Sequence, residues 1–212
     1  MRNVLYIHGM GGGSDSRIPS ILSDICSCQS IKVIARTYSF DPEVAADQIG
    51  HWVKELNPVV VIGESLGALH ALRLRGVPHV FVSPALNAPL FFGPMAWLTL
   101  IPGMTWIFDR IYRPREGDRQ PLHFTFGTLR KYRRHRVEAL KGLPADSGND
   151  IFFAFFGEHD HYRRSGVVSV RAWRRYFGND SYRMYDGTHF MEEEFVRTML
   201  ADKVFELVSK IR

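Results

Sequence analysis

Short apolar runs alternate with segments of helical periodicity along most of this chain. The runs are rich in β-branched or aromatic residues, and glycine, proline and polar positions separate them, which is typical of strands buried in a parallel sheet. Six runs of this kind occur, at residues 2–8, 31–37, 58–63, 79–83, 150–157 and 181–185. The pattern therefore predicts about six strands, most of them parallel.

The segments between these runs carry apolar residues at helical spacing. Ala45, Ile49 and Trp52 share one face, and the preceding Asp41-Pro42 pair is typical of a helix start. Further helices are expected at residues 19–26, 66–75 and 167–176, and near the C-terminus. Because strands alternate with helices, we expect an α/β fold with a mostly parallel sheet that helices cover on both faces.

The alternation is interrupted between residues 84 and 149. We interpret residues 86–148 as a cap or lid inserted into a single domain that spans residues 1–212. The insertion begins with a very apolar stretch that several prolines and glycines interrupt, whereas a membrane span needs roughly 20 consecutive apolar residues. We expect Phe91, Phe92 and Trp97 to contact an apolar part of a substrate. A second small core without any substrate role is the alternative.

The distribution of charge and the number of cysteines bear on the ligands and the cellular compartment that we expect for the protein. The net charge is +5, and ten Lys/Arg against four Asp/Glu lie between Asp109 and Lys141, so the basic excess belongs to one segment. Its densest part, residues 130–136, contains one aromatic residue, which favours a solvated helix face over a nucleic-acid or anionic-ligand site. Two cysteines, Cys26 and Cys28, are too few for a disulfide framework, and they favour a reducing cytoplasmic compartment.

The pentapeptide Gly63-Glu64-Ser65-Leu66-Gly67 follows the third apolar run and precedes a helical segment. A G-x-S-x-G motif in this context is typical of a strained strand–turn–helix that exposes a nucleophilic serine. The neighbours of such a serine must be small, and the two glycines meet this need. A serine that merely caps the helix is the alternative interpretation.

The glycine-rich segment His8-Gly9-Met10-Gly11 follows the first run. Acyl transfer places negative charge on the former carbonyl oxygen, and two backbone N–H donors are needed to stabilise it. We assign these donors to Leu66 and to Met10, or to Gly11 in place of Met10. We also expect His8, Gly9, Gly11 and Glu64 to contact the substrate. A dinucleotide-binding loop is less favoured, because the acidic residue expected after the second strand is missing.

A serine nucleophile needs a base and an acid, and both occur after later runs. His189 follows the last strand, and Asp160 follows the phenylalanine-rich strand, with Glu158 and Asp186 as weaker candidates for the acid. All of these positions lie at the carboxyl ends of strands, which share one edge of a parallel sheet. His159 and His161, with Asp160 and His189, are also conceivable metal ligands, but no H-E-x-x-H helix accompanies them, and we expect no metal.

Together these segments resemble the α/β-hydrolase superfamily, whose members use the chain order serine, acid, histidine. The matching pieces begin at His8 and end at His189, so they bracket almost the whole chain. Among its members, the small bacterial esterases of the YqiA type are similar to this chain. The resemblance implies a Ser–His–Asp hydrolase that needs no cofactor.

These observations lead to one preferred function and two alternatives. We expect a serine hydrolase of the carboxylesterase kind that cleaves a small-molecule carboxylic ester or thioester, with an apolar acyl group, through an acyl-enzyme. The partners we expect are small molecules, with no nucleic acid and no integral membrane association. An acyltransferase with the same residues, or a catalytically silent binding protein that uses the apolar pocket and the basic face, are the alternatives.

Overall fold

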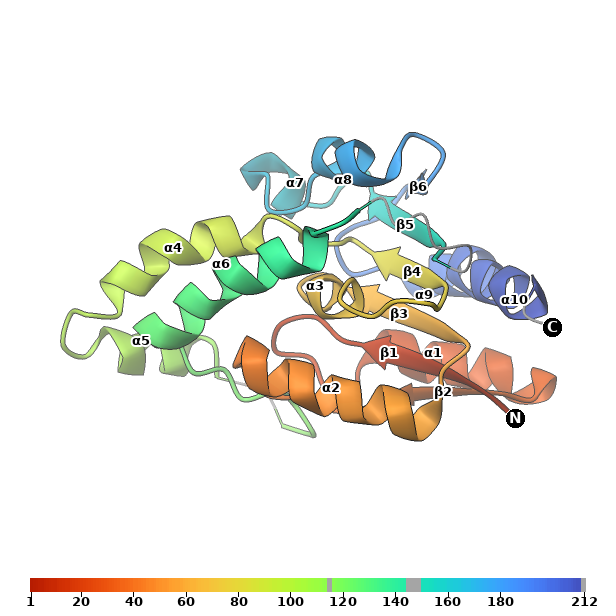
Figure 1. Cartoon of the computed structure of the whole chain (residues 1–212), viewed down its shortest axis with the longest axis horizontal. Coiled ribbons are helices and arrows are strands. Elements are labelled where there is room, and N and C mark those ends of the chain that lie inside the picture. The colour runs from red at the N-terminus through yellow and green to blue at the C-terminus, as the bar shows by residue number, and fades with distance from the viewer. Residues whose placement is uncertain (114–115, 144–149, 211–212) are drawn as a thin grey trace.

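Six parallel strands form a single sheet in the part of the chain that the computed structural model describes, residues 1–113, 116–143 and 150–210 (Figure 1). The strands are β1 (Arg2–Ile7), β2 (Ile31–Ala35), β3 (Val60–Glu64), β4 (His79–Val82), β5 (Phe152–Gly157) and β6 (Tyr182–Tyr185). They are ordered β2-β1-β3-β4-β5-β6, and every neighbouring pair is parallel. The six-stranded parallel sheet predicted from the apolar runs is confirmed.

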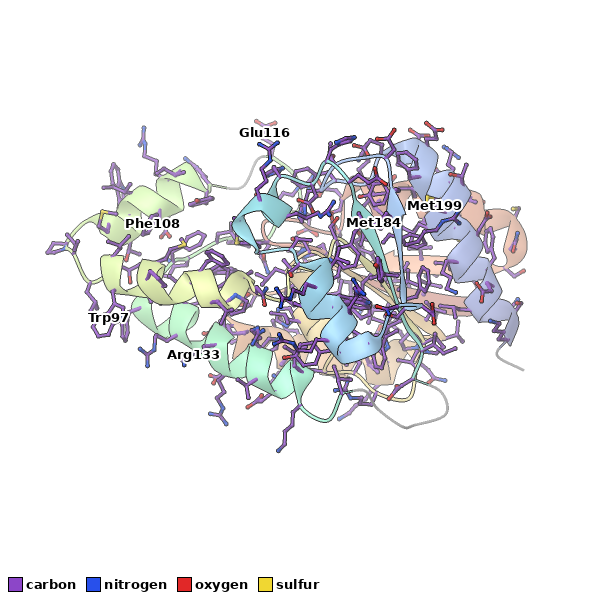
Figure 2. The ribbon with its side chains drawn as sticks, turned by 90° about the horizontal axis from the view of Figure 1, so that it is seen from above. Trp97, Phe108, Glu116, Arg133, Met184 and Met199 are labelled. Atoms are coloured by element: carbon purple, nitrogen blue, oxygen red, sulfur yellow. The ribbon has the colours of Figure 1, made fainter. Side chains whose placement is uncertain are left out.

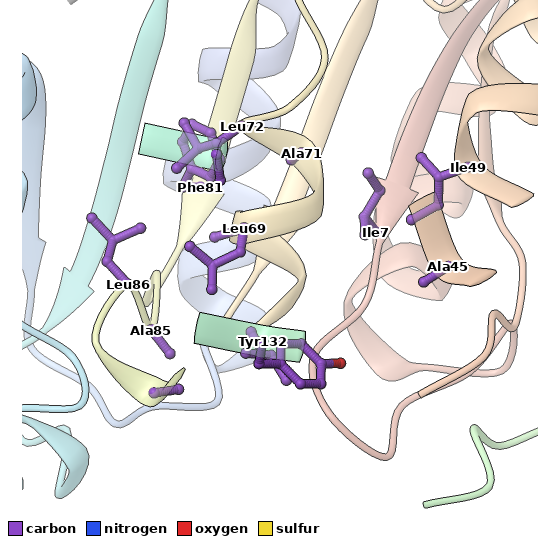
Figure 3. Close-up of a cluster of buried hydrophobic side chains, with 14 of the residues drawn as sticks. Ile7, Ala45, Ile49, Leu69, Ala71, Leu72, Phe81, Ala85, Leu86 and Tyr132 are labelled. Carbon is purple, nitrogen blue, oxygen red and sulfur yellow. The ribbon is translucent and has the colours of Figure 1, made fainter. Parts of the chain in front are cut away.

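Both faces of the sheet are buried, which explains why its strands read as continuous apolar runs. In β1, Leu5 and Ile7 face one core, whereas Val4 and Tyr6 face the other. The neighbouring strands divide their side chains between the same two cores, because successive side chains of a strand point to opposite faces. Figure 3 shows part of the first core, in which Ile7 and Phe81 of the sheet lie among helical side chains.

Helices cover the two faces unequally. Residues of α2 (Pro42–Leu56), α3 (Gly67–Ala71), α6 (Phe126–Leu140) and α8 (Val170–Phe177) fill the first core. Residues of α1 (Arg17–Cys26), the π-helical turn η2 (Val196–Leu200) and α10 (Ala201–Lys210) fill the second. The remaining short elements are η1 (Ser27–Gln29), α7 (Tyr162–Ser165) and α9 (Glu193–Phe195).

The predicted boundaries agree with the structure for α2 and differ for three other helices, of which α1 begins at Arg17, two residues before its expected start. Helix α2 begins at Pro42, where the Asp41 carboxylate accepts the N–H of Glu43 at 3.0 Å. The helix expected over residues 66–75 ends at Ala71, because the N–H groups of Arg73 and Leu74 bond three residues back and tighten the turn. The helix expected from residue 167 begins at Val170, where the Ser169 hydroxyl accepts the N–H of Ala172.

The connection from β4 to β5 contains α4 (Ala88–Leu98), α5 (Met104–Ile111) and α6. These helices extend beyond the sheet at the left of Figure 1, where α4 and α5 form a hairpin. We call residues 86–148 the cap segment; positions 114–115 and 144–148 of it lie outside the described residues. None of the helices in the described ranges has the length and apolar content needed to cross a bilayer.

Several histidines are buried in the folded protein without charge. Burial lowers the pKa of His8, His79 and His135 to about 4. The His79 ring packs against the rings of Phe81 and Phe152, at centroid distances of 5.8 and 5.2 Å. The Arg73 guanidinium donates to Nδ1 of His135 at 2.9 Å, which requires that nitrogen to be unprotonated.

These histidines predict that acid destabilises the fold. Unfolded histidines bind a proton near pH 6.5, so the unfolded chain binds more protons than the folded one between about pH 6.5 and pH 4. The stabilisation is therefore complete above about pH 6.5 and is lost as the pH falls toward 4, by up to about 2 kcal/mol per histidine at pH 5. Urea unfolding at pH 7.5 and pH 5 measures the loss. His79→Phe should reduce it, whereas replacing the exposed His51 by glutamine should not.

Candidate active site

Ser65 lies in a strained turn between β3 and α3. Its φ is +48°, a region that non-glycine residues enter at a cost of about 1–3 kcal/mol. Two contacts hold this conformation: the Ser65 N–H donates to the carbonyl of Val82 at 2.9 Å, and the Ser65 carbonyl accepts the N–H of Ala85 at 3.0 Å. The start of the β4–β5 connection therefore holds the serine backbone in place.

The glycines on either side of Ser65 are required by close approach. A Cβ at Gly67 would lie 2.3 Å from the carbonyl oxygen of His8, and one at Gly63 would lie 2.9 Å from the Cβ of Ala71. Either substitution would force the backbone apart, because these neighbours are the backbone just after β1 and the short Ala71 side chain of α3 rather than flexible side chains. The motif thus keeps the serine turn close to the loop after β1.

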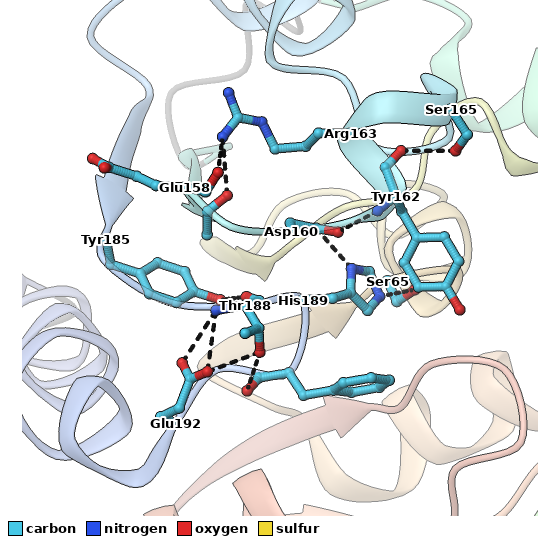
Figure 4. Close-up of polar contacts among 12 residues, drawn as sticks. Ser65, Glu158, Asp160, Tyr162, Arg163, Ser165, Tyr185, Thr188, His189 and Glu192 are labelled. Atoms are coloured by element: carbon cyan, nitrogen blue, oxygen red, sulfur yellow. Dashed lines mark hydrogen bonds and ion pairs between the residues drawn. The ribbon is translucent and has the colours of Figure 1, made fainter.

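The structure brings Ser65, His189 and Asp160 together in one hydrogen-bonded chain (Figure 4). His189 Nε2 lies 2.9 Å from the Ser65 Oγ, and its Nδ1 lies 2.8 Å from Oδ2 of Asp160. The histidine and the aspartate are each only 3% exposed. The other Asp160 oxygen accepts the N–H of Tyr162 at 2.8 Å, which orients the carboxylate. This is the geometry that transfer of a serine proton to an imidazole requires.

The other acidic candidates lie away from His189. Glu158 is exposed, and Asp186 pairs at the surface with His159 at 2.8 Å. The His161 ring lies 6.2 Å from the His189 ring and contacts Tyr162 instead. Among the described residues, no group of three or more His, Cys, Asp and Glu side chains is arranged to hold a metal ion.

Hydrogen bonds to Thr188, the residue before His189, hold the loop that carries the histidine. The Tyr185 hydroxyl donates to the carbonyl of Thr188 at 2.6 Å, and the Thr188 hydroxyl and N–H donate to the Glu192 carboxylate at 2.8 and 3.1 Å (Figure 4). A Cβ at Gly157 would lie 2.2 Å from the Thr188 carbonyl oxygen, so the Asp160 and His189 loops touch at that point. The close contact explains how residues 29 positions apart keep a fixed distance.

Backbone N–H groups of two loops lie beside Ser65. Met10 and Leu66 line the same cavity as the serine, and in the described part of the chain neither of their N–H groups has a hydrogen-bond partner. The N–H of Gly11, the alternative donor from the sequence, instead binds the Gln120 side chain at 3.1 Å. A Cβ at Gly9 would lie 3.1 Å from the Ser65 Cβ, so this glycine allows the loop to approach the serine.

His8 and Glu64 support this loop. The Glu64 carboxylate accepts the Tyr6 hydroxyl at 2.8 Å and the Gly9 N–H at 3.4 Å. Burial, with the nearby Glu64 charge, raises the pKa of Tyr6 well above its usual value, so the hydroxyl remains a donor. His8 is fully buried, stacks on the Tyr38 ring at 4.2 Å and does not line the cavity, contrary to the expectation that it contacts substrate.

A cavity of about 440 Å³ opens at Ser65 and His189. Its apolar wall includes Ala88, Phe91, Phe92 and Met95 from the start of the cap segment, with Ala85 just before the segment and Val167 well after it. Trp97 does not line it; its side chain is 60% exposed and contacts the Phe126 ring, because the last turn of α4 lies beyond the cavity. Glu64, Gly9 and Gly11, which we expect to contact substrate, also line the cavity.

Sequence reasoning missed several residues of the cavity. The Tyr162 ring lies edge-on to the His189 ring at 4.6 Å, and Tyr162 and Phe190 both line the cavity. Both residues lie within two positions of a candidate catalytic residue, and this closeness in sequence could have indicated that they line the cavity. Arg17 and Arg119 also reach the cavity wall, and nothing in the local sequence of either residue indicated this position.

The structure is similar to several solved α/β enzymes. Est1E from Butyrivibrio proteoclasticus, solved with ferulic acid bound, aligns over 99% of this chain and 90% of its own, at 14% identity and a TM-score of 0.65. The metagenome-derived lipolytic enzymes LipS and LipT (13%, TM-score 0.61, 98% and 93% covered) are also similar. So is the thioesterase domain of the curacin biosynthetic pathway (15%, TM-score 0.61, 97% and 91% covered).

At these identities the similarity concerns the fold, and the family is shown by a sequence model. No match to this chain is found among curated protein sequences. The model of the α/β hydrolase family, however, matches residues 4–203, which include most of β1, the other five strands and every residue of the hydrogen-bonded chain. The chain therefore belongs to the α/β hydrolase family.

Proposed function

We propose that this α/β hydrolase cleaves carboxylic esters or thioesters through an acyl-enzyme on Ser65. The hydrogen-bonded chain from Ser65 through His189 to Asp160 carries the proposal. His189 Nε2 accepts the serine proton as Oγ attacks the substrate carbonyl carbon. Asp160 accepts the N–H of Nδ1 and stabilises the imidazolium that forms.

The N–H groups of Met10 and Leu66 hold the oxyanion of the tetrahedral intermediate. Each such donor is worth about 3 kcal/mol of transition-state stabilisation. His189 then gives its proton to the leaving alcohol or thiol. Water, deprotonated by the same imidazole, attacks the acyl carbonyl and releases the acid, so the serine is regenerated.

The apolar wall of the cavity favours an apolar acyl group. Phe91, Phe92 and Met95 of α4 line it, and a cavity of this size is typical of small-molecule sites. In this proposal the cap segment covers the acyl group as a lid. The relatives that cleave esters or act on thioesters have the same fold but are too distant to identify the leaving group. The proposal also places the protein among the YqiA-like members of the family. It includes a cytoplasmic location, which the free thiols of Cys26 and Cys28 favour.

A panel of nitrophenyl esters and matching thioesters of increasing acyl length tests the function. We expect turnover that depends on chain length, together with covalent labelling by a fluorophosphonate. Transfer of the acyl group to an added alcohol in preference to water would identify an acyltransferase. Failure to label with the fluorophosphonate would identify a catalytically silent binding protein instead.

Met95→Trp tests the acyl site. The larger ring should exclude about three methylenes of a long chain, each worth about 0.8 kcal/mol when buried. We therefore expect kcat/KM for an octanoyl ester to fall by roughly 30-fold or more, with acetyl ester turnover nearly unchanged. Leu98→Trp is the matched control, because Leu98 lies on the same helix but is outside the cavity and 45% exposed. An equal loss for both esters would contradict this acyl site.

A further inference from the structure

The tip of the cap segment exposes a large apolar surface. The tip comprises residues 97–111: the last turn of α4, the following turn and α5. Six of its large apolar side chains leave 45–67% of their surface in solvent. They are Trp97, Leu98, Leu100, Ile101, Trp106 and Ile111. Scattered exposed apolar residues are ordinary, whereas a concentration of large ones on one short projection marks a surface that another body covers.

The shape of the tip is convex. Figure 1 shows α4 and α5 projecting past the edge of the sheet, and Figure 2 draws Trp97 on the outside of this projection. In α4 apolar residues lie on all sides, so that one side faces the cavity and α6 while the other faces solvent. A helix that is apolar all round is normally buried, which is not the case here.

Positive charge surrounds the apolar tip. The Arg110 guanidinium lies 5.5 Å from the Trp106 ring, and that of Arg130 lies 5.5 Å from the Phe126 ring. Figure 2 shows Arg133 on the same side of the cap as Trp97. Among the described residues, no carboxylate lies within ion-pair distance of Arg110, Arg130 or Arg133, whereas Lys131 and Arg134 are paired. The unpaired charges are thus next to the apolar surface.

The apolar tip and the unpaired arginines together indicate which kind of partner docks there. In a symmetric dimer through the tip, each basic rim would face its own copy, and like charges would repel. An anionic bilayer surface complements both features, because headgroups pair with the arginines while tryptophan and leucine side chains enter the acyl boundary. Helix α4 has 11 residues and is about 16 Å long, so a docked tip enters one leaflet without spanning.

We propose that the tip of the cap segment, residues 97–111 with the arginines beside it, docks this protein on anionic lipid surfaces. Helix α4 both borders the tip and lines the cavity, so docking would bring the acyl site close to the lipid. The substrates would then be esters with acyl groups that partition into membranes. The substrate class rests on the proposed function, but the docking itself does not.

Sedimentation with sucrose-loaded vesicles tests the docking. The vesicles contain phosphatidylcholine alone, or phosphatidylcholine and phosphatidylglycerol in equal parts, and the protein carries Ser65→Ala so that no turnover occurs. We expect binding to the anionic vesicles, weak binding to the neutral ones, and a blue shift of tryptophan fluorescence. Leu100→Glu with Ile101→Glu should weaken anionic binding by more than about tenfold, because headgroups repel the new carboxylates.

Val44→Glu is the control for an added carboxylate: it introduces one, where the tip variant introduces two, at a 48% exposed apolar position in the first turn of α2. It should leave vesicle binding unchanged, and thermal unfolding should verify that all variants fold. Equal binding by the tip variant and wild type, no binding by either, or a dimer in lipid-free buffer that the tip variant dissociates would each overturn the proposal. Turnover of a soluble acetyl ester is measured separately with the protein that retains Ser65. This measurement distinguishes a failure of docking from a failure of the proposed hydrolysis.

Discussion

Ser65→Ala is expected to reduce ester hydrolysis by roughly 10⁴- to 10⁶-fold while the protein remains folded. Alanine removes the oxygen that would form the acyl-enzyme, whereas the N–H donors of Met10 and Leu66 and the cavity remain. The residual rate should then come from oxyanion stabilisation and binding alone. Steady-state kinetics with an acetyl nitrophenyl ester measure the loss, and fluorophosphonate labelling should disappear with it.

A second serine provides the control for this experiment. Ser20 is exposed on α1, and Ser20→Ala should leave both labelling and turnover at the wild-type level. Thermal unfolding should show that Ser65→Ala remains folded, since the hydroxyl is the only group removed. Labelling that persists in Ser65→Ala would mean that another residue is the nucleophile, and the proposed mechanism would be abandoned.

Asp160→Asn is expected to lower kcat by about 10⁴-fold. In the native protein the carboxylate can only accept, so His189 carries its proton on Nδ1 and leaves Nε2 free to take the serine proton. An amide in this buried position would donate to Nδ1 and favour the opposite tautomer, in which Nε2–H cannot act as a base. The volume is nearly unchanged, so binding of substrate should suffer much less than kcat.

Glu158→Gln is the matched control for the acid. Glu158 lies two residues earlier in the same loop but is exposed, and its removal should change kcat by less than about twofold. A large loss in Glu158→Gln with little loss in Asp160→Asn would reverse the assignment of the acid. Measuring kcat and KM separately for both variants distinguishes the tautomer effect from a general disturbance of the loop.

Much of the candidate site could be anticipated from positions after strands. Ser65, Asp160 and His189 each follow the end of an apolar run, and the carboxyl ends of parallel strands meet at one edge of a sheet. The sequence therefore predicted that these side chains lie near one another before any distance was available. The sequence favours Asp160 over Glu158, but it does not show which of the two carboxylates points toward His189. The direction of each side chain depends on how the loop turns after β5.

The environment of the cap could not be predicted in the same way. In α4 apolar residues surround the helix, so periodicity does not distinguish Met95, which lines the cavity, from Trp97, which faces solvent. The basic segment poses the same difficulty. Lys131 pairs with Asp41 at 2.7 Å and Arg136 donates to the carbonyl of Leu86, although both partners are distant in sequence.

Local patterns in the sequence are sufficient to predict the six-stranded parallel architecture, the strained serine turn and the edge of the sheet where the candidate site lies. These features depend on local patterns: strand and helix periodicity, glycines at tight turns, and residue types at strand ends. Tertiary packing, in contrast, buries His8 against Tyr38, brings the Gln120 side chain to the Gly11 N–H, and selects the cap side chains that line the cavity. Such contacts join segments that are far apart in the chain, and their energies depend on the packing of the whole domain, which no local pattern records.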